Sequence, residues 1–300
     1  MNTLQTIFKS HGEGKLATKI FVASEDGFNV TSTIVMGKKE CILIDCQWTR
    51  ANAHRVIAEI LETGLELKAI FATHAHPDHY WGMGEIHDVF PNAKCYAPAP
   101  VVTLYAHQYQ PKLDEWVETI GEDNLCRKQC PALEPLDKDY MELEGEKLEI
   151  IRCMGDLMWN TIVWIPSIKT VVCSDVVFNE AHPFTCEVNK EQRALWVKDI
   201  EGIYALEPEV VVPGHMKEGC ELDLTGLKFT KDYLLATEEE IEKTTTPGEF
   251  YYHMAERFPG ASLNHLSNEM NAEVFKGGRD WAWNEDPDPE WLKFRTAWKD

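Results

Sequence analysis

Three histidines and one aspartate fall within six consecutive positions, in the stretch THAHPDHYWG at 73–82. They directly follow an apolar run that is typical of a buried strand. In a loop that leaves a strand, alternate residues can point to the same side, so we expect His74 and His76 to converge on one ion. Asp78 and His79 would then reach a second ion. Packing gives no reason for such a cluster, and the stretch therefore predicts a metal site.

The ligand types indicate which metals fit. Neutral imidazole and carboxylate are the usual ligands of zinc, and also of manganese or iron where more oxygen ligands are present. We therefore expect two zinc ions, with manganese or iron as the alternative metals.

Two later strand ends carry residues of the same kinds. The run KTVVCSD ends in Asp175, and the run EVVVPGH ends in His215, after a Pro-Gly turn that exposes the next side chain. Catalytic groups on loops at the same edge of a sheet form a site by convergence. These residues join the histidine cluster only if the fold brings the strand ends together.

The elements that must position these residues are visible as short β-branched runs bounded by turn residues. The predicted strands are 19–23, 31–36, 41–45, 67–72, 147–152, 161–166, 169–174 and 209–213. The patterns also predict helices at 50–64, with Gly64 as a C-terminal stop, and at 190–206, and a mostly helical region at 222–275. Several strands follow one another too closely for a crossover helix, so part of the sheet must be antiparallel. Two sheets with helices outside would fit.

Composition limits the partners. The formal charge is −21, from 50 acidic and 29 basic residues, which repels nucleic acid and anionic membrane surfaces. The sequence shows no signal-peptide pattern and no apolar run of membrane-helix length, so we expect a soluble, cytoplasmic protein with a small-molecule substrate. The nine cysteines include no Cys-x-x-Cys pair and are expected to be reduced thiols in the core.

The C-terminal segment is rich in tryptophan. Its four tryptophans favour a terminal segment docked by aromatic anchors, with a ligand or homodimer surface as the alternative. They are Trp281, Trp283, Trp291 and Trp298.

Taken together, these motifs resemble the metallo-β-lactamase superfamily. The resemblance covers roughly residues 18 to 220 and rests on the His-x-His-x-Asp-His stretch, an aspartate closing an early strand (Asp45), the later Asp175 and the final His215. It implies an α/β (α+β) fold, a four-layer αββα sandwich formed by residues 1–220. Residues 221–300 would form a mostly helical C-terminal extension packed on the same domain.

The resemblance also implies roles for the ligands. The first metal would be bound by His74 and His76, the second by Asp78, His79 and His215, and Asp175 would bridge them. Asp45 would fix the histidine loop, although an aspartate at a strand end can equally cap a turn.

One departure from the family pattern concerns the third histidine of the first metal. The stretch RCMGDLMWNTIVWIP contains no histidine. Alignment without gaps places Asp156 at that position, whereas the pattern of another branch places Met154 there. A carboxylate binds a hard divalent ion better than a thioether does, so Asp156 is the predicted ligand. The alternative is that Asp156 caps a turn and the first site is weak or empty.

Two adjacent divalent ions supply a hydroxide that is nucleophilic at neutral pH, which makes hydrolysis the natural reaction. Asp78 would be the catalytic residue that orients the water and passes a proton to the leaving group. The stretch at 161–184 resembles lactone- and lactam-opening members, which predicts a lactamase- or lactonase-like hydrolase, as in xenobiotic detoxification. His182 would then contact the substrate, and Tyr80 and Trp81 would wall the pocket. The alternatives are a thioesterase of the glyoxalase II type and a non-catalytic metal-binding protein with a degraded site.

Overall fold

The computed structural model describes residues 5–12 and 15–280. The four tryptophans of the C-terminal segment lie outside the described residues, so the interpretation of that segment stays a prediction. Among the helices in the described ranges, none is both long and apolar enough to cross a bilayer.

The first sheet has seven strands in sequence order: β1 (Gln5–Ser10), β2 (Ala17–Val22), β3 (Thr31–Met36), β4 (Glu40–Ile44), β5 (Glu66–Phe71), β6 (Lys94–Ala97) and β7 (Leu133–Pro135). The pairs from β1 to β4 are antiparallel, and those from β4 to β7 are parallel. The parallel pairs are joined through helices: α1 (Arg50–Thr63), then α2 (Pro77–Tyr80) and α3 (Met83–Val89), then α4 (Ala99–Ile120). This mixture of pairings confirms that part of the sheet is antiparallel.

Helix α1 shows how the sequence sets its own boundaries. The Thr49 side chain accepts a hydrogen bond from the backbone N–H of Asn52, which satisfies a donor at the first turn. Gly64 ends the helix in the left-handed conformation, with φ 68°, as its position in the sequence predicted.

The second sheet has five strands: β8 (Tyr140–Leu143), β9 (Glu146–Cys153), β10 (Asn160–Ile165), β11 (Thr170–Asn179) and β12 (Val210–Met216). Its spatial order is β12-β11-β10-β9-β8. Only β11 and β12 are parallel among these five strands, because helix α5 (Lys190–Ala205) connects them. Short 3₁₀ turns lie at 25–27, 122–124 and 166–168.

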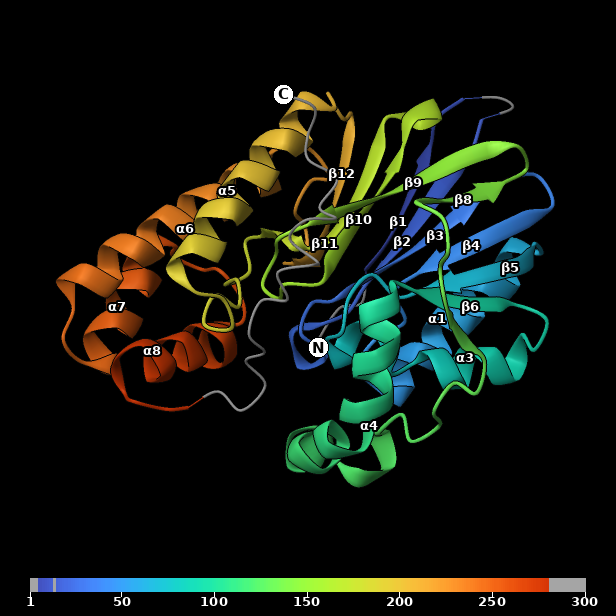
Figure 1. Cartoon of the computed structure of the whole chain (residues 1–300). Coiled ribbons are helices and arrows are strands. Elements are labelled where there is room, and N and C mark those ends of the chain that lie inside the picture. Colours follow the sequence, from blue (N-terminus) through green and yellow to red (C-terminus); the bar gives the residue numbers. More distant parts are fainter. Residues whose placement is uncertain (1–4, 13–14, 281–300) are drawn as a thin grey trace.

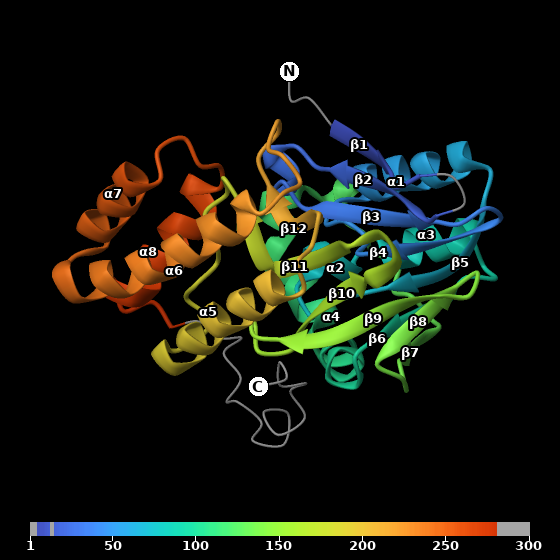
Figure 2. The same cartoon turned by 90° about the horizontal axis from the view of Figure 1, so that it is seen from above.

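The layers follow the predicted αββα order. Helices α1 and α3 lie on the outer side of the seven-stranded sheet, and α5 and α6 (Thr225–Lys243) cover the five-stranded sheet (Figures 1 and 2). Between the sheets lies a buried apolar cluster with Ile42 and Ile44 from one sheet and Val163 and Val172 from the other. Burial of this apolar surface holds the two sheets face to face.

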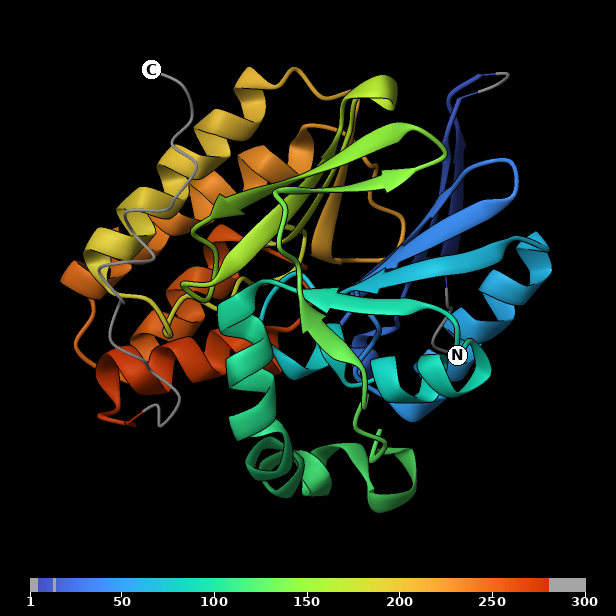
Figure 3. The ribbon, with the colours of Figure 1, turned by 45° about the vertical axis from the view of Figure 1, so that its right-hand side comes forward.

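The C-terminal part is helical, as predicted for 222–275. Helix α6 is followed by α7 (Pro247–Arg257), a π-helical turn (Asn264–Asn268) and α8 (Glu269–Lys276). These helices share a separate apolar cluster that includes Tyr233, Phe250 and Met254. Figure 3 shows α4 and the C-terminal helices on either side of one end of the sandwich, and residues from both regions line the pocket described below.

Candidate metal centre

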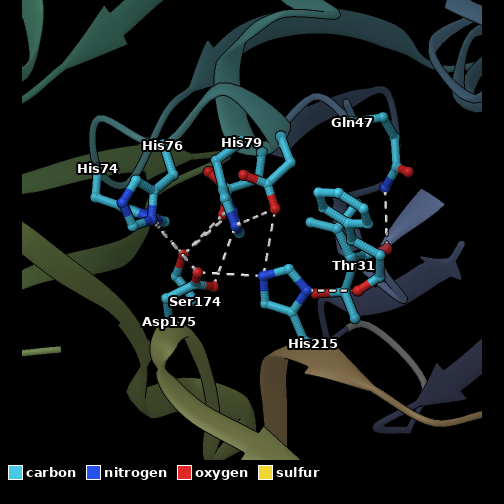
Figure 4. Close-up of polar contacts among 12 residues, drawn as sticks. Thr31, Gln47, His74, His76, His79, Ser174, Asp175 and His215 are labelled. Carbon is cyan, nitrogen blue, oxygen red and sulfur yellow. Dashed lines mark hydrogen bonds and ion pairs between the residues drawn. The ribbon is translucent and has the colours of Figure 1, made fainter. Parts of the chain in front are cut away.

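The stretch that follows β5 presents its side chains in two ways. His76 is extended, with φ −85° and ψ 140°, and is the N-cap of the single-turn helix α2, which contains Asp78 and His79. His74 and His76 therefore leave the strand end in extended backbone, while Asp78 and His79 come from a helical turn. Figure 4 shows the rings of His74, His76 and His79 directed towards Asp175, with His215 approaching from β12.

A first group of possible ligands is formed by His74, His76, Asp156 and Asp175, whose ligand atoms all lie within 4.8 Å of one another. His76 Nδ1 is 3.0 Å from Asp156 Oδ2, and His74 Nε2 is 3.5 Å from Asp175 Oδ2. All four residues are buried. The group contains the carboxylate that stands where the family pattern has histidine.

Met154, the other candidate for that position, lies elsewhere. Its side chain belongs to the main hydrophobic cluster, and its backbone N–H donates to Asp199 Oδ2 at 2.6 Å. Asp156 is held in place instead by its own contacts, since Asn160 Nδ2 donates to its Oδ1 at 3.1 Å. The structure therefore brings Asp156, and not Met154, to the histidines.

A second group is formed by Asp78, His79 and His215, again with ligand atoms within 4.8 Å of one another. His215 Nε2 lies 3.3 Å from Asp78 Oδ2, and His79 Nε2 lies 3.5 Å from the same oxygen. Asp175 also touches this group, with Oδ1 3.1 Å from His79 Nε2 and Oδ2 3.2 Å from His215 Nε2. Asp175 thus lies between the two groups, where a bridging ligand has to be.

The histidine rings of the second group are oriented by hydrogen-bond acceptors that lie outside the group. Asp45 Oδ2 is 2.8 Å from Nδ1 of His79, and the carbonyl oxygen of Phe28 is 2.6 Å from Nδ1 of His215. Each acceptor takes the Nδ1–H, so Nε2 is the nitrogen that is directed into the group and would bind a metal. Asp45 also accepts from the backbone N–H of Thr73 at 2.9 Å and so fastens the start of the histidine loop.

The rings of the first group have different supports. Nδ1 of His74 lies 3.1 Å from Thr73 Oγ1 and 3.2 Å from Ser174 Oγ, so its Nε2 faces the group. Nε2 of His76 lies 3.0 Å from Glu187 Oε2, so its Nδ1 faces the group. Glu187 was not anticipated, because it belongs to no motif and precedes helix α5 in an irregular segment.

The backbone around Asp175 is irregular in ways that serve this convergence. Register shifts interrupt the β11–β12 pairing on either side of Ser174, which has φ 46°, and such bulges redirect side chains. A Cβ added to Gly214 would lie 2.0 Å from Asp175 Oδ1. The Pro-Gly turn predicted from sequence is in fact part of strand β12, and its glycine lets that strand approach the aspartate.

The pKa values of the first group's residues are shifted because charged groups are buried close together. Burial raises the pKa of Asp156 to about 7. The neighbouring Asp175 also raises this pKa, whereas His76 lowers it. Burial and the neighbouring His79 lower the pKa of His74 to about 4, so its ring is neutral at pH 7. Burial alone would lower the pKa of His76, but Asp156 and Glu187 outweigh it and hold that pKa well above its ordinary value.

The donor set fits divalent cations. His74 Nε2, His79 Nε2 and Asp175 Oδ1 are buried and make no hydrogen bond within the described residues. Buried polar atoms normally have partners, and these three face the two groups. Imidazole nitrogens and carboxylate oxygens in these numbers would satisfy two ions such as zinc.

A pocket opens over both groups. Its floor includes His76, Asp78, Asp156, Asp175 and His215. Its walls are largely apolar and come from distant parts of the chain: Phe28, Trp48, Trp116, Phe178, Phe184, Leu263 and Leu266. A concave, mostly apolar site with a few convergent polar groups is typical of small-molecule binding.

Three residues predicted to contact substrate are not among those that line this pocket. Tyr80 and Trp81 are fully buried, because the helical turn directs them into the core, where Trp81 stacks on Trp48 with ring centroids 5.5 Å apart. His182 is buried beside α6, and its Nδ1 lies 3.0 Å from the hydroxyl oxygen of Tyr233. The aromatic wall is instead made by Phe28, Trp48 and Trp116.

Lys112 of α4 is a further pocket residue that sequence reasoning missed. It is buried, and its Nζ lies 3.5 Å from the carbonyl oxygen of Ala75. Ala75 is the residue between His74 and His76 in the sequence. Burial lowers the pKa of Lys112, while Glu187 and Asp78 oppose that shift. No local pattern in α4 distinguishes this lysine from an exposed one.

Comparison with known proteins agrees with the geometry. The profile of the family described as Metallo-beta-lactamase superfamily matches residues 26–215, more than half of the chain. A metallo-beta-lactamase from Pontibacter korlensis is similar in structure, at 19% identity and a TM-score of 0.57, over 77% of this chain and 99% of that one. The DIM-1 metallo-beta-lactamase, from a crystal exposed to ceftazidime, has 19% identity and a TM-score of 0.56, over 77% and 97%. A comparison with curated proteins gives no match.

Proposed function

Because the chain belongs to the metallo-β-lactamase superfamily, we propose that this metallo-hydrolase opens a small cyclic amide or ester, that is, a lactam or a lactone. The observation that carries the proposal is the position of the two ligand groups at the floor of a small, largely apolar pocket. Two divalent ions bound there would activate water and polarise the attacked carbonyl.

Asp78 supplies the proton transfer in this proposal. It lines the pocket and lies against both histidines of the second group. Burial would raise the pKa of Asp78, but His79 and His215 outweigh burial and hold this pKa below its ordinary value. The carboxylate is therefore ionised at neutral pH, can accept a proton from the attacking water at one oxygen, and can return it to the leaving nitrogen or oxygen.

The pocket walls support a small, neutral substrate. Phe28 and Trp48 pack with ring centroids 4.0 Å apart, and Trp48 and Trp116 with centroids 5.0 Å apart. Such a wall excludes water and suits an apolar ring. In addition to the carboxylates that would bind metal, the pocket is lined by Glu115, Glu187 and a single lysine, Lys112. The remaining negative charge disfavours substrates with more than one carboxylate, such as glutathione thioesters.

The test is a substrate screen on the zinc-loaded protein with lactones, lactams and glutathione thioesters. We expect kcat/KM for the best lactone or lactam to exceed that for the thioester, and we expect chelation to abolish turnover. The Asp78→Asn variant, purified in the same way, controls for contaminating hydrolases and should lose the activity. A glutathione thioester that surpasses every lactone and lactam would overturn this proposal in favour of a thioesterase.

A further inference from the structure

The segment 180–189, here called the Glu187 loop, connects β11 to α5 and brings one carboxylate to the metal centre. Glu187 Oε2 is 3.0 Å from His76 Nε2, and the Glu187 side chain is only 2% exposed. Asp156 contacts the opposite nitrogen of the same ring, Nδ1, at 3.0 Å. Glu187 therefore lies behind His76 as seen from the first ligand group.

The Glu187 loop is fastened from the C-terminal helices. The side-chain oxygen of Asn271, on α8, accepts from the backbone N–H groups of Thr185 and Cys186 at 2.9 and 3.0 Å. The side-chain nitrogen of Asn271 donates to the carbonyl of Pro183 at 2.9 Å. One buried asparagine thus fixes three backbone groups just before Glu187.

A second clamp comes from α5 and α6. Arg193 Nη1 donates to the carbonyl of Thr185 at 3.2 Å and also to that of Val188. The same guanidinium is paired through Nε with Glu238 of α6. The loop is therefore held on both sides of Glu187 by residues that follow it in the chain.

We propose that Glu187 is a positioning residue for His76, and that the C-terminal helices set the geometry of the first ligand group through the Glu187 loop. Glu187 accepts the Nε2–H of His76, so that Nδ1, which faces Asp156, is the nitrogen that would bind the first ion. The C-terminal helices are then part of the metal centre's support and not only a cover for the sheet. This inference concerns metal binding and does not depend on which substrate is hydrolysed.

The direct test measures zinc affinity at each group by competition with a chromogenic chelator. Glu187→Ala should weaken binding at the first group by about 10–100-fold, the effect typical of removing a partner of a metal-bound histidine, and leave the second group unchanged. Glu187→Gln should weaken it less, because the amide oxygen still accepts the Nε2–H. Glu180→Gln, an exposed acid in the same loop, is the matched control and should have no effect.

A spectroscopic measurement separates positioning from general stability. In the zinc-loaded protein, the Nε2–H proton of His76 should give a downfield signal protected from solvent exchange. This signal should be retained in Glu187→Gln and lost in Glu187→Ala.

The role of the helices is tested by a pair of asparagine variants. Asn271→Ala releases the Glu187 loop and should weaken the first group severalfold. Asn268→Ala removes a neighbouring buried asparagine whose side chain bonds Tyr251 and Asn264 instead of the loop, and should leave both affinities unchanged. Unchanged first-group affinity in Glu187→Ala would overturn the proposal for Glu187, and equal losses in the two asparagine variants would overturn the proposal for the helices.

Discussion

The two ligand groups share the loop after β5 but depend on opposite ends of the chain. The second group is supported by Asp45 and the carbonyl of Phe28, both within the first fifty residues. The first group is supported by Glu187 and, through its loop, by the helices beyond β12. One centre is thus assembled from two supports that meet at Asp175 and are linked by Thr73 and Ser174, whose hydroxyls contact both Asp45 and Nδ1 of His74.

The groups also differ in charge. Each contains two histidines and one carboxylate of its own, but in the first group that carboxylate is Asp156, which stands where the family pattern has a neutral imidazole. The added negative charge favours a harder ion and makes the bound water less acidic. The comparison teaches that a single substitution can tune one half of such a centre while the other half keeps the family's pattern.

The largest effect is expected where the two groups meet. Asp175→Ala removes a carboxylate that contacts His74, His79 and His215. Metal analysis should show that both ions are lost or severely depleted, and turnover should fall by more than the roughly 100-fold that supporting residues cost. If one group keeps full occupancy and the enzyme stays active, Asp175 does not bridge.

The next largest effect should be selective. Asp156→Ala should empty the first group and lower the rate while the second group stays filled, and His215→Ala should do the reverse. Competition titrations of the two variants measure this directly. Met154→Ala serves as the control and should retain both ions. If Met154→Ala loses the first ion while Asp156→Ala retains it, Met154 and not Asp156 is the ligand.

Asp156→His should keep the metal and change the chemistry. Imidazole brings no negative charge, so the acidity of the activated water should increase and the pH–rate profile should move to lower pH. Rates measured across pH on the zinc-loaded variant check this shift. A profile that is unmoved or moves to higher pH would contradict the charge argument.

A smaller effect on metal binding is expected when Asp45, which supports the second group, is changed. Asp45→Asn leaves an oxygen for one hydrogen bond but removes the charge beside His79 Nδ1. Zinc affinity at the second group should fall by about tenfold, the lower end of the range for such partners. The loss at the first group should be smaller, because Asp45 reaches His74 only through Thr73 and Ser174. A loss confined to the first group would refute the assignment of Asp45 to the second group.

The last effect lies outside both groups, at His182, and concerns the stability of the fold instead of metal binding. Burial lowers the pKa of His182 to about 4, so folding keeps the ring neutral while the unfolded chain takes up a proton below about pH 6.5. Its contribution to stability is therefore complete above pH 6.5 and is lost as the pH falls towards 4. In His182→Asn, the drop in unfolding free energy between pH 7 and pH 5 should be smaller than in the wild type, by about 2 kcal/mol. Equal drops would show that His182 is not the group responsible.

The sequence predicts those parts of the centre that come directly after β-branched runs, namely His74 to His79, Asp175 and His215. In the structure Asp175 lies within β11 and His215 within β12, and both contact the histidines that follow β5. Asp156 could be placed because the family pattern aligns without gaps across the short hairpin that separates it from Asp175. In both cases the information is local in the chain.

The residues that could not be predicted depend on distant contacts. Glu187 contacts His76 from a loop that is bonded by Asn271, more than eighty residues later in the chain. Tyr80 and Trp81 were expected in the pocket because they follow the ligands, but a single helical turn at 77–80 directs them into the core. Which side of a short helix faces a cavity is set by packing, and no pattern in these few residues encodes it.

Metal stoichiometry and turnover, measured on the same sample, test the central claim most directly. The protein should be purified, reconstituted with zinc, freed of excess ion, analysed for metal and assayed with the best lactone or lactam before and after chelation. The structure leads us to expect two equivalents of metal per chain, with activity that disappears on chelation and returns when zinc is restored. A metal-free protein with full activity would contradict the account.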